Sequence, residues 1–439
     1  MNLRKIYGQL AENYWFFPGL MTLAGVFGGL LAASLDRWFE VNQLLALLGL
    51  DRVSAEGARS LLSTAAASMI GVAGVTFSIT IAAIATVTTQ FGSRVFANFM
   101  EDRGSQLTLG IFLGTFAYCM VVLGWVRSPT ESHGGFVPQI ALAGGMLLVL
   151  LSVGGLIYFI HHTTDMLRIQ TQIDAVGRQM RRAINERFES GGDASETGAP
   201  EPEWDRHDEI VSTQAGYVRR IDHAELVSIA RDNDCALRVL VSPGDFVMTG
   251  QAILRHNGTQ DDLEAARGAF RLGASRSAAQ DITYYLDQLV EIAVRALSPG
   301  INDPFTAGNA VDWLSEGFAA LSGRQLPGAV VSDDAGSPRV FRNALDFEAV
   351  VDGTLSQLMP YFAGDRNATL QLMDALVCCY RACNQRHRRA VFAEQATRLR
   401  EMAADKLDPQ TLAVLDRRID SLDRREAEEE DDDDTPRAG

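Results

Sequence analysis

Four long stretches of this 439-residue chain contain no Asp, Glu, Lys, Arg or His: Phe17–Leu35, Ser60–Gly92, Leu107–Val126 and Phe136–Ile160. A membrane-spanning helix needs about 20 predominantly apolar residues, and in lipid its backbone must be hydrogen-bonded internally. Each stretch is therefore predicted to be a transmembrane helix. Because proton-coupled transporters and pumps usually carry ionisable residues inside their spans, this absence disfavours active transport. It favours passive conduction, sensing or anchoring.

The usual marks of an enzyme are also missing. We find no nucleophile–base pair, zinc-ligand spacing or glycine-rich phosphate loop, and we expect no catalysis, cofactor or bound metal. The net charge of −16 argues against a nucleic-acid partner, because such proteins normally present a basic surface. Much of this charge lies in the run Glu428–Asp434, which is typical of a disordered tail. We assign residues 426–439 to that tail.

Basic residues near the ends of the spans predict their orientation, because cytoplasmic loops carry an excess of Lys and Arg. One side of the membrane would hold Arg4, Lys5, Arg94, Arg103, Arg168, Arg178, Arg181, Arg182 and Arg187. The other side would hold Arg37, Arg52, Arg59 and Arg127. Since the first set is larger, both termini are predicted to be cytoplasmic.

The second apolar stretch is longer than a bilayer requires, and its residues separate into three helical faces. Small residues from Thr64 to Ala85 form a face that predicts close helix packing. The face that suits lipid contains Ile70, Phe77, Ile81 and Ile84. The remaining face is the candidate pore lining and contains Ser68, Val72, Thr76, Thr80, Thr86, Gln90 and Arg94.

Two interpretations of this candidate pore face stay open. Small hydroxylated side chains line wetted paths, but they also pack and hydrogen-bond between helices of one chain. Gln90 and Arg94 favour the pore, because they are costly to bury against lipid. Val72 counts against a wet path.

The fourth apolar stretch ends in two histidines followed by an acid. His161 and Asp165 have the i, i+4 spacing of a helical pair, and His162 lies beside them. Histidine changes its charge near neutral pH, so these three residues are a candidate switch at the membrane interface. The alternative is a polar cap at the end of the span.

A soluble α+β region is predicted to follow the membrane domain at 1–166. Residues 167–206 are assigned to a helix extension and a linker. Short strand patterns and turn signals predict a small β module at 207–258. Within it, Gly216–Val218 and Val241–Gly250 resemble the barrel-sandwich hybrid of biotinyl and lipoyl domains. The chain has only Lys5 and Lys406, so the modified lysine of those domains is missing and a swinging-arm carrier is excluded.

Helical periodicity predicts a helical domain at 259–425, and its first part contains a cluster of polar residues. Asp303 is predicted to cap a helix that has Pro304 at its first position. An anion held at this helix start would indicate a ligand site, whereas buried ion pairs would indicate a structural corner. The candidate ligand or assembly corner contains Arg271, Arg276, Asp281, Arg295, Asn302 and Asp303.

Three motifs resemble one family along nearly the whole chain. Thr89–Arg94, Tyr158–His162 and Arg295–Ala307 are similar to segments of the bacterial predicted membrane proteins grouped as domain of unknown function 2254. The resemblance implies a multi-pass protein of the bacterial inner membrane. It implies no activity.

These features together predict a homo-oligomeric channel for ions or small solutes, with the lipid bilayer and further copies of the chain as its partners. A single four-helix bundle has no room for a wide path, so the second span of several copies would surround one axis. The soluble region would gate or assemble the channel. The alternative is a non-conducting membrane sensor or scaffold whose soluble region binds a ligand or a protein partner.

Overall fold

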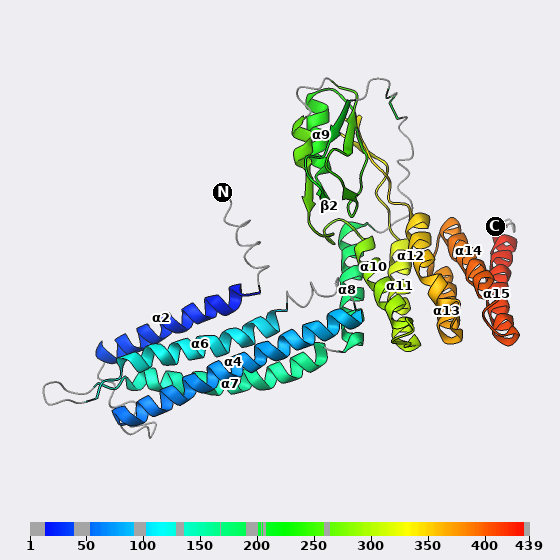
Figure 1. Cartoon of the computed structure of the whole chain (residues 1–439). Helices are drawn as coiled ribbons and strands as arrows, with labels where there is room; N and C mark the ends of the chain where they lie inside the picture. The colour runs from blue at the N-terminus through cyan, green and yellow to red at the C-terminus, as the bar shows by residue number, and fades with distance from the viewer. Residues whose placement is uncertain are drawn as a thin grey trace, which may run out of the picture. The chain divides into compact units, whose positions relative to one another are not determined.

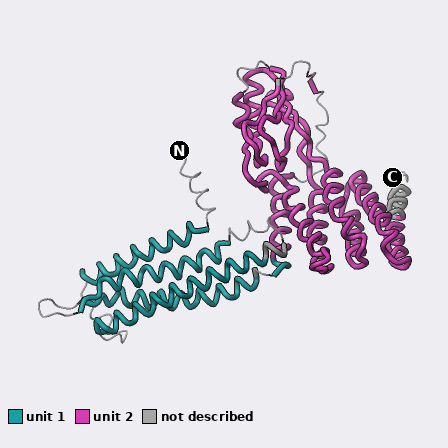
Figure 2. Tube along the Cα trace, viewed as in Figure 1, with its two compact units in different colours: residues 1–171 teal, residues 172–439 magenta. Residues whose placement is uncertain are grey.

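A computed structural model describes residues 14–38, 53–91, 102–128, 136–166, 168–189, 201–202, 204, 208–258 and 264–433. The chain divides into two compact units, residues 1–171 and 172–439, which Figure 2 shows in different colours.

The first unit contains the four predicted spans. They are the helices α2 (Phe16–Trp38), α4 (Ala55–Phe91), α6 (Arg103–Trp125) and α7 (Gln139–Met166), labelled in Figure 1. All four are long and apolar enough to cross a membrane, which confirms the prediction from the uncharged stretches. Helix α6 packs against the other three, and its apolar window is the most buried of the four.

Small residues bring α2 and α6 close together. A Cβ atom built on Gly25 would lie 2.2 Å from the backbone oxygen of Gly114. Hydroxyl groups connect α6 to α7: Thr115 and Ser152 are 3.0 Å apart, and the Tyr118 hydroxyl donates to the Ala141 carbonyl at 2.9 Å. Close backbone approach and interhelical hydrogen bonds are the usual means of holding helices together in lipid.

The second unit contains a β module of two sheets. One sheet has the strand order β1-β5-β3-β8-β7 and the other β4-β2-β6. The strands are β1 (Asp208–Val211), β2 (Gly216–Ile221), β3 (Leu237–Val239), β4 (Phe246–Val247), β5 (Ala252–His256), β6 (Phe270–Gly273), β7 (Val330–Ser332) and β8 (Pro338–Phe341). Between β2 and β3 lies α9 (His223–Asp232), and a 3-10 helix, η2 (Glu264–Ala269), precedes β6.

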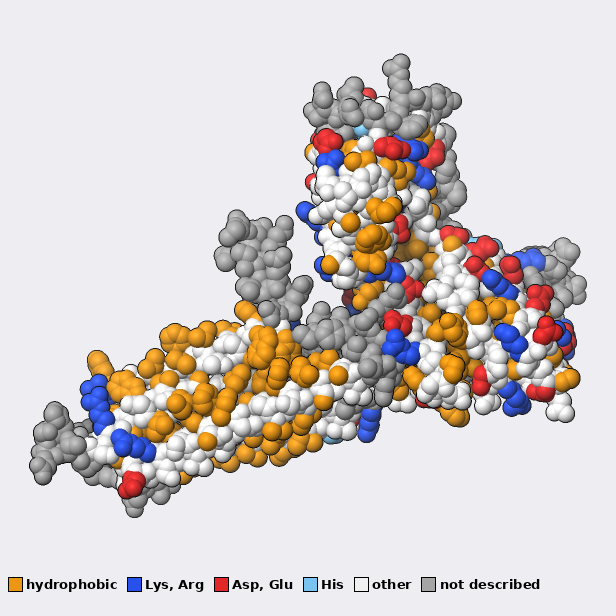
Figure 3. Space-filling model, viewed as in Figure 1, with side chains coloured by type: hydrophobic (Ala, Val, Ile, Leu, Met, Phe, Trp, Pro, Cys, Tyr) orange, Lys and Arg blue, Asp and Glu red, His pale blue; other side chains and the backbone are white. Residues whose placement is uncertain are grey.

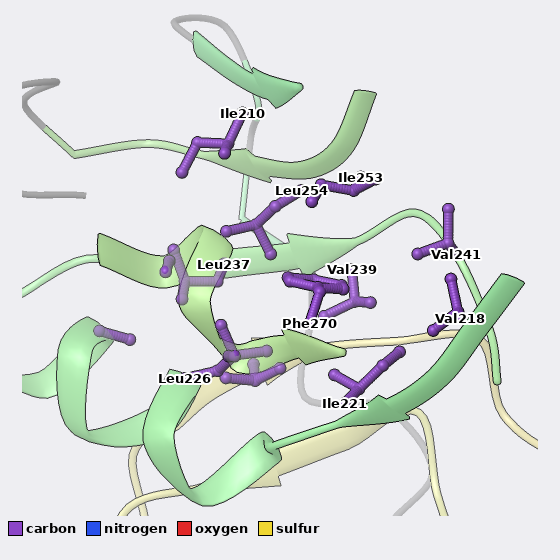
Figure 4. Close-up of a cluster of buried hydrophobic side chains, with 14 of the residues drawn as sticks. Ile210, Val218, Ile221, Leu226, Leu237, Val239, Val241, Ile253, Leu254 and Phe270 are labelled. Carbon is purple, nitrogen blue, oxygen red and sulfur yellow. The ribbon is translucent and has the colours of Figure 1, made fainter. Parts of the chain in front are cut away.

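A single apolar core fills this module, and Figure 4 shows its side chains converging from both sheets and from α9. Val218, Leu226, Leu237 and Leu254 are completely buried. The five strands expected within 207–258 are present as β1 to β5. The barrel-sandwich arrangement stays a prediction, since the sheets also recruit three strands from beyond residue 258.

Those three strands correct the sequence-based assignment. A helical domain was expected at 259–425, but within it β6 pairs with β2, and β7 pairs with β8. Strand β8 pairs in parallel with β3, about a hundred residues earlier, and buries Val340 completely. Local periodicity does not reveal such a pairing, because the partner strand is far away in the sequence.

The rest of the second unit is helical, as predicted. Its helices are α8 (Ile169–Arg187), α10 (Thr283–Ala296), α11 (Pro304–Ser322), α12 (Phe347–Phe362), α13 (Arg366–Ala382), α14 (Arg386–Ala403) and α15 (Pro409–Asp433). Helix α8 lies against α11, where Gly177 faces Trp313 and Met180 faces Gly317. Helix α15 continues to Asp433, so most of the acidic run is helical where a disordered tail was expected. Glutamate is a good helix former, which favours this extension of α15.

Candidate functional site

The candidate pore face of α4 is not a single exposed strip. Thr76 and Thr80 are buried, with 2% and 8% of their surface exposed. Val72 is half-buried, and Ser68 and Thr86 are exposed. The side chain of Gln90 and the whole of Arg94 lie outside the described residues.

Thr76 and Thr80 face the interior of the first unit. Around this part of α4, Met69 and Ala73 form an apolar cluster with Leu109 and Phe112 of α6. The Thr80 hydroxyl donates to the backbone oxygen of Thr76 at 2.9 Å, so its proton is satisfied within α4. This is the arrangement that the packing interpretation predicts for these two threonines.

A different face of α4 points away from the other described helices. We call it the small-residue face, and it contains Thr64, Ala67, Gly71, Gly74, Ser78, Ala82 and Ala85. Every one of these residues is exposed, and a Cβ atom on Gly71 or Gly74 would meet nothing within 4 Å. Of the face expected to suit lipid, Ile70 and Ile81 are exposed, whereas Ile84 is buried. The face that was expected to pack is thus uncovered by the described residues of the chain.

The polar end of α7 contains one pair that was predicted and one that was not. His161 Nε2 lies 3.4 Å from a carboxylate oxygen of Asp165, at an exposed position. His162 Nε2 instead lies 3.0 and 3.1 Å from the two carboxylate oxygens of Asp102, the residue that caps α6. Tyr158 stacks on the His162 ring, with 5.2 Å between centroids. The partner of His162 lies sixty residues away in the sequence, so spacing alone gave no signal for it.

The candidate corner in the soluble unit divides into two structural features. The first is an ion-pair network at the start of α10, in which Arg276 Nε donates to Asp281 Oδ2 at 3.0 Å and Nη2 donates to the Thr283 hydroxyl at 2.9 Å. Arg276 also pairs with Asp287, which the sequence analysis missed. Gly244, in the turn before β4, has φ +100°, and a Cβ there would lie 2.4 Å from Asp281 Oδ2. The network therefore joins the β module to the helices.

The second feature is the turn between α10 and α11. Asp303 caps α11, because its carboxylate accepts from the Thr306 N–H at 3.1 Å and from the Thr306 hydroxyl at 2.6 Å. These hydrogen bonds lower the pKa of Asp303. Asn302 has φ +51°, the left-handed conformation that ends many helices. Arg295 lies 3.6 Å from Glu291 on its own helix, and Arg271 is exposed on β6. The predicted cap and the first-turn proline are confirmed.

A cavity of about 560 Å³ lies within the soluble unit beside the Arg276 network. Its walls come from the end of α8, the start of α9, the 241–245 turn, the start of α10 and the segment after β8. Asp281 is the one member of the predicted corner that lines it. The other polar lining residues include Arg187, His223, Ser242, Asp245, Gln280, Thr283, Arg342 and Asn343.

A larger and more open groove, of about 750 Å³, lies between α8 and α11. Arg181 in this groove pairs with Glu316, and Arg178 pairs with Asp174. Because these two arginines already have acidic partners and the groove is more open, it is a weaker candidate for a ligand site than the cavity.

Comparison with known proteins agrees with the architecture. Two mycobacterial proteins described as uncharacterized, from Mycobacterium tuberculosis and Mycobacterium bovis, are each 29% identical to this chain over 334 residues. The aligned region covers 73% of this chain and 63% of each relative, so the chain spans less than two thirds of the relatives' length. No solved structure matches the chain. The model of the predicted membrane protein family DUF2254 matches residues 11–377, and the chain therefore belongs to this family.

Proposed function

We propose that this protein is a homo-oligomeric channel of the bacterial inner membrane, in which α4 helices from several copies meet through their small-residue faces. These helices enclose a passive path for ions or small solutes. Copies of the chain and the lipid bilayer are its partners, and the soluble unit assembles or gates the path.

The uncovered small-residue face is the observation that carries this proposal. The outer surfaces of α2 and α7 present large apolar side chains, such as Phe27 and Leu150, which are 68% and 69% exposed. Figure 3 shows such hydrophobic side chains spread over the surface of the first unit. The small-residue face of α4 lacks them over about six turns. Lipid requires no such face, whereas close contact between helices does.

The hydroxyl groups along this side of α4 suit a wetted path. Ser78 donates to the backbone oxygen of Gly74 at 2.9 Å, and Thr86 donates to that of Ala82 at 2.9 Å. Each hydroxyl proton is thus satisfied within the helix, and the oxygen of the exposed Ser78 hydroxyl keeps its capacity to accept a hydrogen bond. Oxygen atoms of this kind replace part of an ion's hydration shell without binding the ion too tightly for conduction.

Both termini are cytoplasmic in this proposal, because the predicted cytoplasmic side carries the larger set of arginines. Reporter fusions after Gly439 and in the loop between Arg127 and Phe136 test the orientation. A C-terminal reporter that is active only outside the cytoplasm would contradict it.

Planar-bilayer recordings of the purified full-length chain test conduction. We expect stepwise currents from the parent protein and their loss in Ser78→Trp, because the bulky ring would fill the path or separate the copies. Leu150→Trp is the matched control, since it places the same ring on an exposed position of α7. Silent bilayers from an assembled oligomer, or parental currents from Ser78→Trp, would contradict the channel.

The second candidate function is a non-conducting sensor or scaffold. The cavity in the soluble unit favours it, because its volume is within the usual range for small-molecule sites, about 300–1,000 Å³. An assembled oligomer that gives no current, but whose soluble unit binds a ligand, would favour the sensor or scaffold over the channel.

A further inference from the structure

The cavity beside the Arg276 network contains two arginines that have no acidic partner in the part of the chain that the structure describes. Among the described residues, Arg187 bonds the backbone oxygen of Ala278, and Arg342 Nε donates to the backbone oxygen of Gly328 at 3.0 Å. Burial lowers the pKa of Arg342, because its guanidinium loses water without gaining a carboxylate. Two half-buried positive charges therefore face the cavity uncompensated.

Two polar atoms in the cavity wall are buried without a partner among the described residues. They are Nη1 of Arg187 and Nδ1 of His223. Burial and the nearby Arg342 charge lower the pKa of His223 to about 4, so its ring is neutral at pH 7. A buried donor or acceptor without a partner destabilises a fold, and a bound ligand is one means of satisfying it.

The acidic residues of the wall do not neutralise these arginines. Asp281 is 3% exposed at its side chain and is committed to Arg276, Thr283 and the Tyr284 N–H. Asp245 is exposed and accepts a hydrogen bond from the Ser242 N–H at 2.7 Å. The region near Arg187 and Arg342 is therefore suited to an anion.

The same cavity also has an apolar side. Phe188, Ile282, Pro327 and Leu345 line it, and small-molecule sites typically combine such a lining with a few convergent polar groups. We propose that the cavity binds a small organic anion, with Arg187, His223 and Arg342 holding its phosphate or carboxylate head. An apolar or aromatic body of the ligand lies against Phe188, Ile282 and Leu345.

Ligand binding here would connect the β module to the helices. The wall includes Ile221 and Val241 of the β module, together with Arg187 of α8 and Thr283 of α10. A bound anion would fasten these elements to one another. This inference deepens the sensor function and is independent of conduction, because binding to the soluble unit is measured directly.

Isothermal titration of the full chain in nanodiscs tests the inference with three probes of similar size. Phenyl phosphate and phenylacetate carry the two candidate heads, and 2-phenylethanol is their neutral counterpart. We expect saturable binding of at least one anion and none of the alcohol, and the tighter anion identifies the head group. Arg342→Gln and Arg187→Gln should each weaken binding by roughly tenfold or more, because each removes a charge-assisted hydrogen bond.

Arg398→Gln is the matched control, since Arg398 pairs with Asp352 on the surface and does not line the cavity. Near-ultraviolet circular dichroism establishes that each variant is folded, and Arg187→Gln carries the test if Arg342→Gln is not. Absence of anion binding by the parent would overturn the inference. Equal binding by the folded glutamine variants, or equal binding of the alcohol, would also overturn it. If the bilayer recordings showed no currents while the chain bound the anion, the channel would be contradicted and the anion site would still be supported.

Discussion

The two units of this chain differ in which side chains they bury. In the four-helix unit, Thr115 and Ser152 are buried, whereas Phe27 and Leu150 are mostly exposed. In the soluble unit, Phe362 and Phe392 are completely buried, and ion pairs such as Arg398–Asp352 lie on the surface. The difference follows from the solvent, since lipid favours an apolar exterior and polar groups then find partners inside.

The residues that indicate a contact surface or a functional site therefore differ between the two units. An exposed leucine in the first unit is ordinary, because lipid covers it, whereas an uncovered run of Gly, Ala and Ser calls for another protein surface. In the soluble unit, a buried charged group without an ionic partner is instead the feature that indicates a functional site. The small-residue face of the first unit meets the first of these criteria, and the arginine-lined cavity of the soluble unit meets the second.

The largest single effect is expected at the Arg276 network. Asp281→Ala should destabilise the soluble unit by about 3 kcal/mol, because it removes one of the two carboxylates around a mostly buried guanidinium. Asp174→Ala is the control, since it removes an exposed i, i+4 pair with Arg178 and should cost less than about 1 kcal/mol. Denaturant unfolding of the full chain in detergent measures both. Equal losses would show that the network has no special role in joining the β module to the helices.

A smaller effect is expected where α2 meets α6. Gly25→Ala should destabilise the first unit by about 1–3 kcal/mol, because the new methyl group would overlap the backbone of Gly114. Gly19→Ala on the same helix has nothing within 4 Å and should be neutral. Thermal unfolding in nanodiscs compares the two variants. If both melted like the parent, the close α2–α6 contact would be refuted.

The smallest effect concerns pH and His223. The pKa of His223 is lowered to about 4 in the folded chain, from an ordinary value of 6.5. The unfolded chain therefore binds the proton first, and stability falls as pH is lowered from 6.5 towards 4. After allowance for partial exposure, we expect a loss of about 1 kcal/mol from this residue.

His223→Asn isolates this contribution, because asparagine does not titrate. The parent should lose more stability than the variant between pH 7 and pH 4, as measured by denaturant unfolding at each pH. Parallel losses would mean that His223 titrates normally in the folded chain.

Local patterns were sufficient to predict much of the fold. Uncharged apolar length predicted the four spans, and the sequence Asp303-Pro304 predicted the start of α11. Pairings over long separations could not be predicted, because nothing near Leu237 indicates that Val340 lies beside it. The orientation of α4 could not be predicted for the same reason. Periodicity separates its residues into three faces, but only tertiary packing determines which face lies against α6.

The candidate sites follow the same rule. Asp281 and Arg276 were placed in one polar cluster because they lie in the same short segment, whereas Asp102 and His162 were not connected. The cavity draws Arg187, His223 and Arg342 from three distant segments. Each is an ordinary residue in its own segment, so their convergence emerges only from the folded chain.

Cysteine cross-linking in membranes tests the central claim most directly, in a Cys378→Ser background that removes the exposed native cysteine. We predict that Gly74→Cys forms disulfide-linked dimers under mild oxidation, one bond joining two neighbouring copies, because their small-residue faces meet there. Gly154→Cys on α7 is the matched control, with equally open surroundings, and Thr80→Cys should stay unreactive inside the subunit. Cross-linking through Gly74→Cys but not through the other two would support the account. A monomeric Gly74→Cys, or efficient cross-linking through Thr80→Cys, would contradict it.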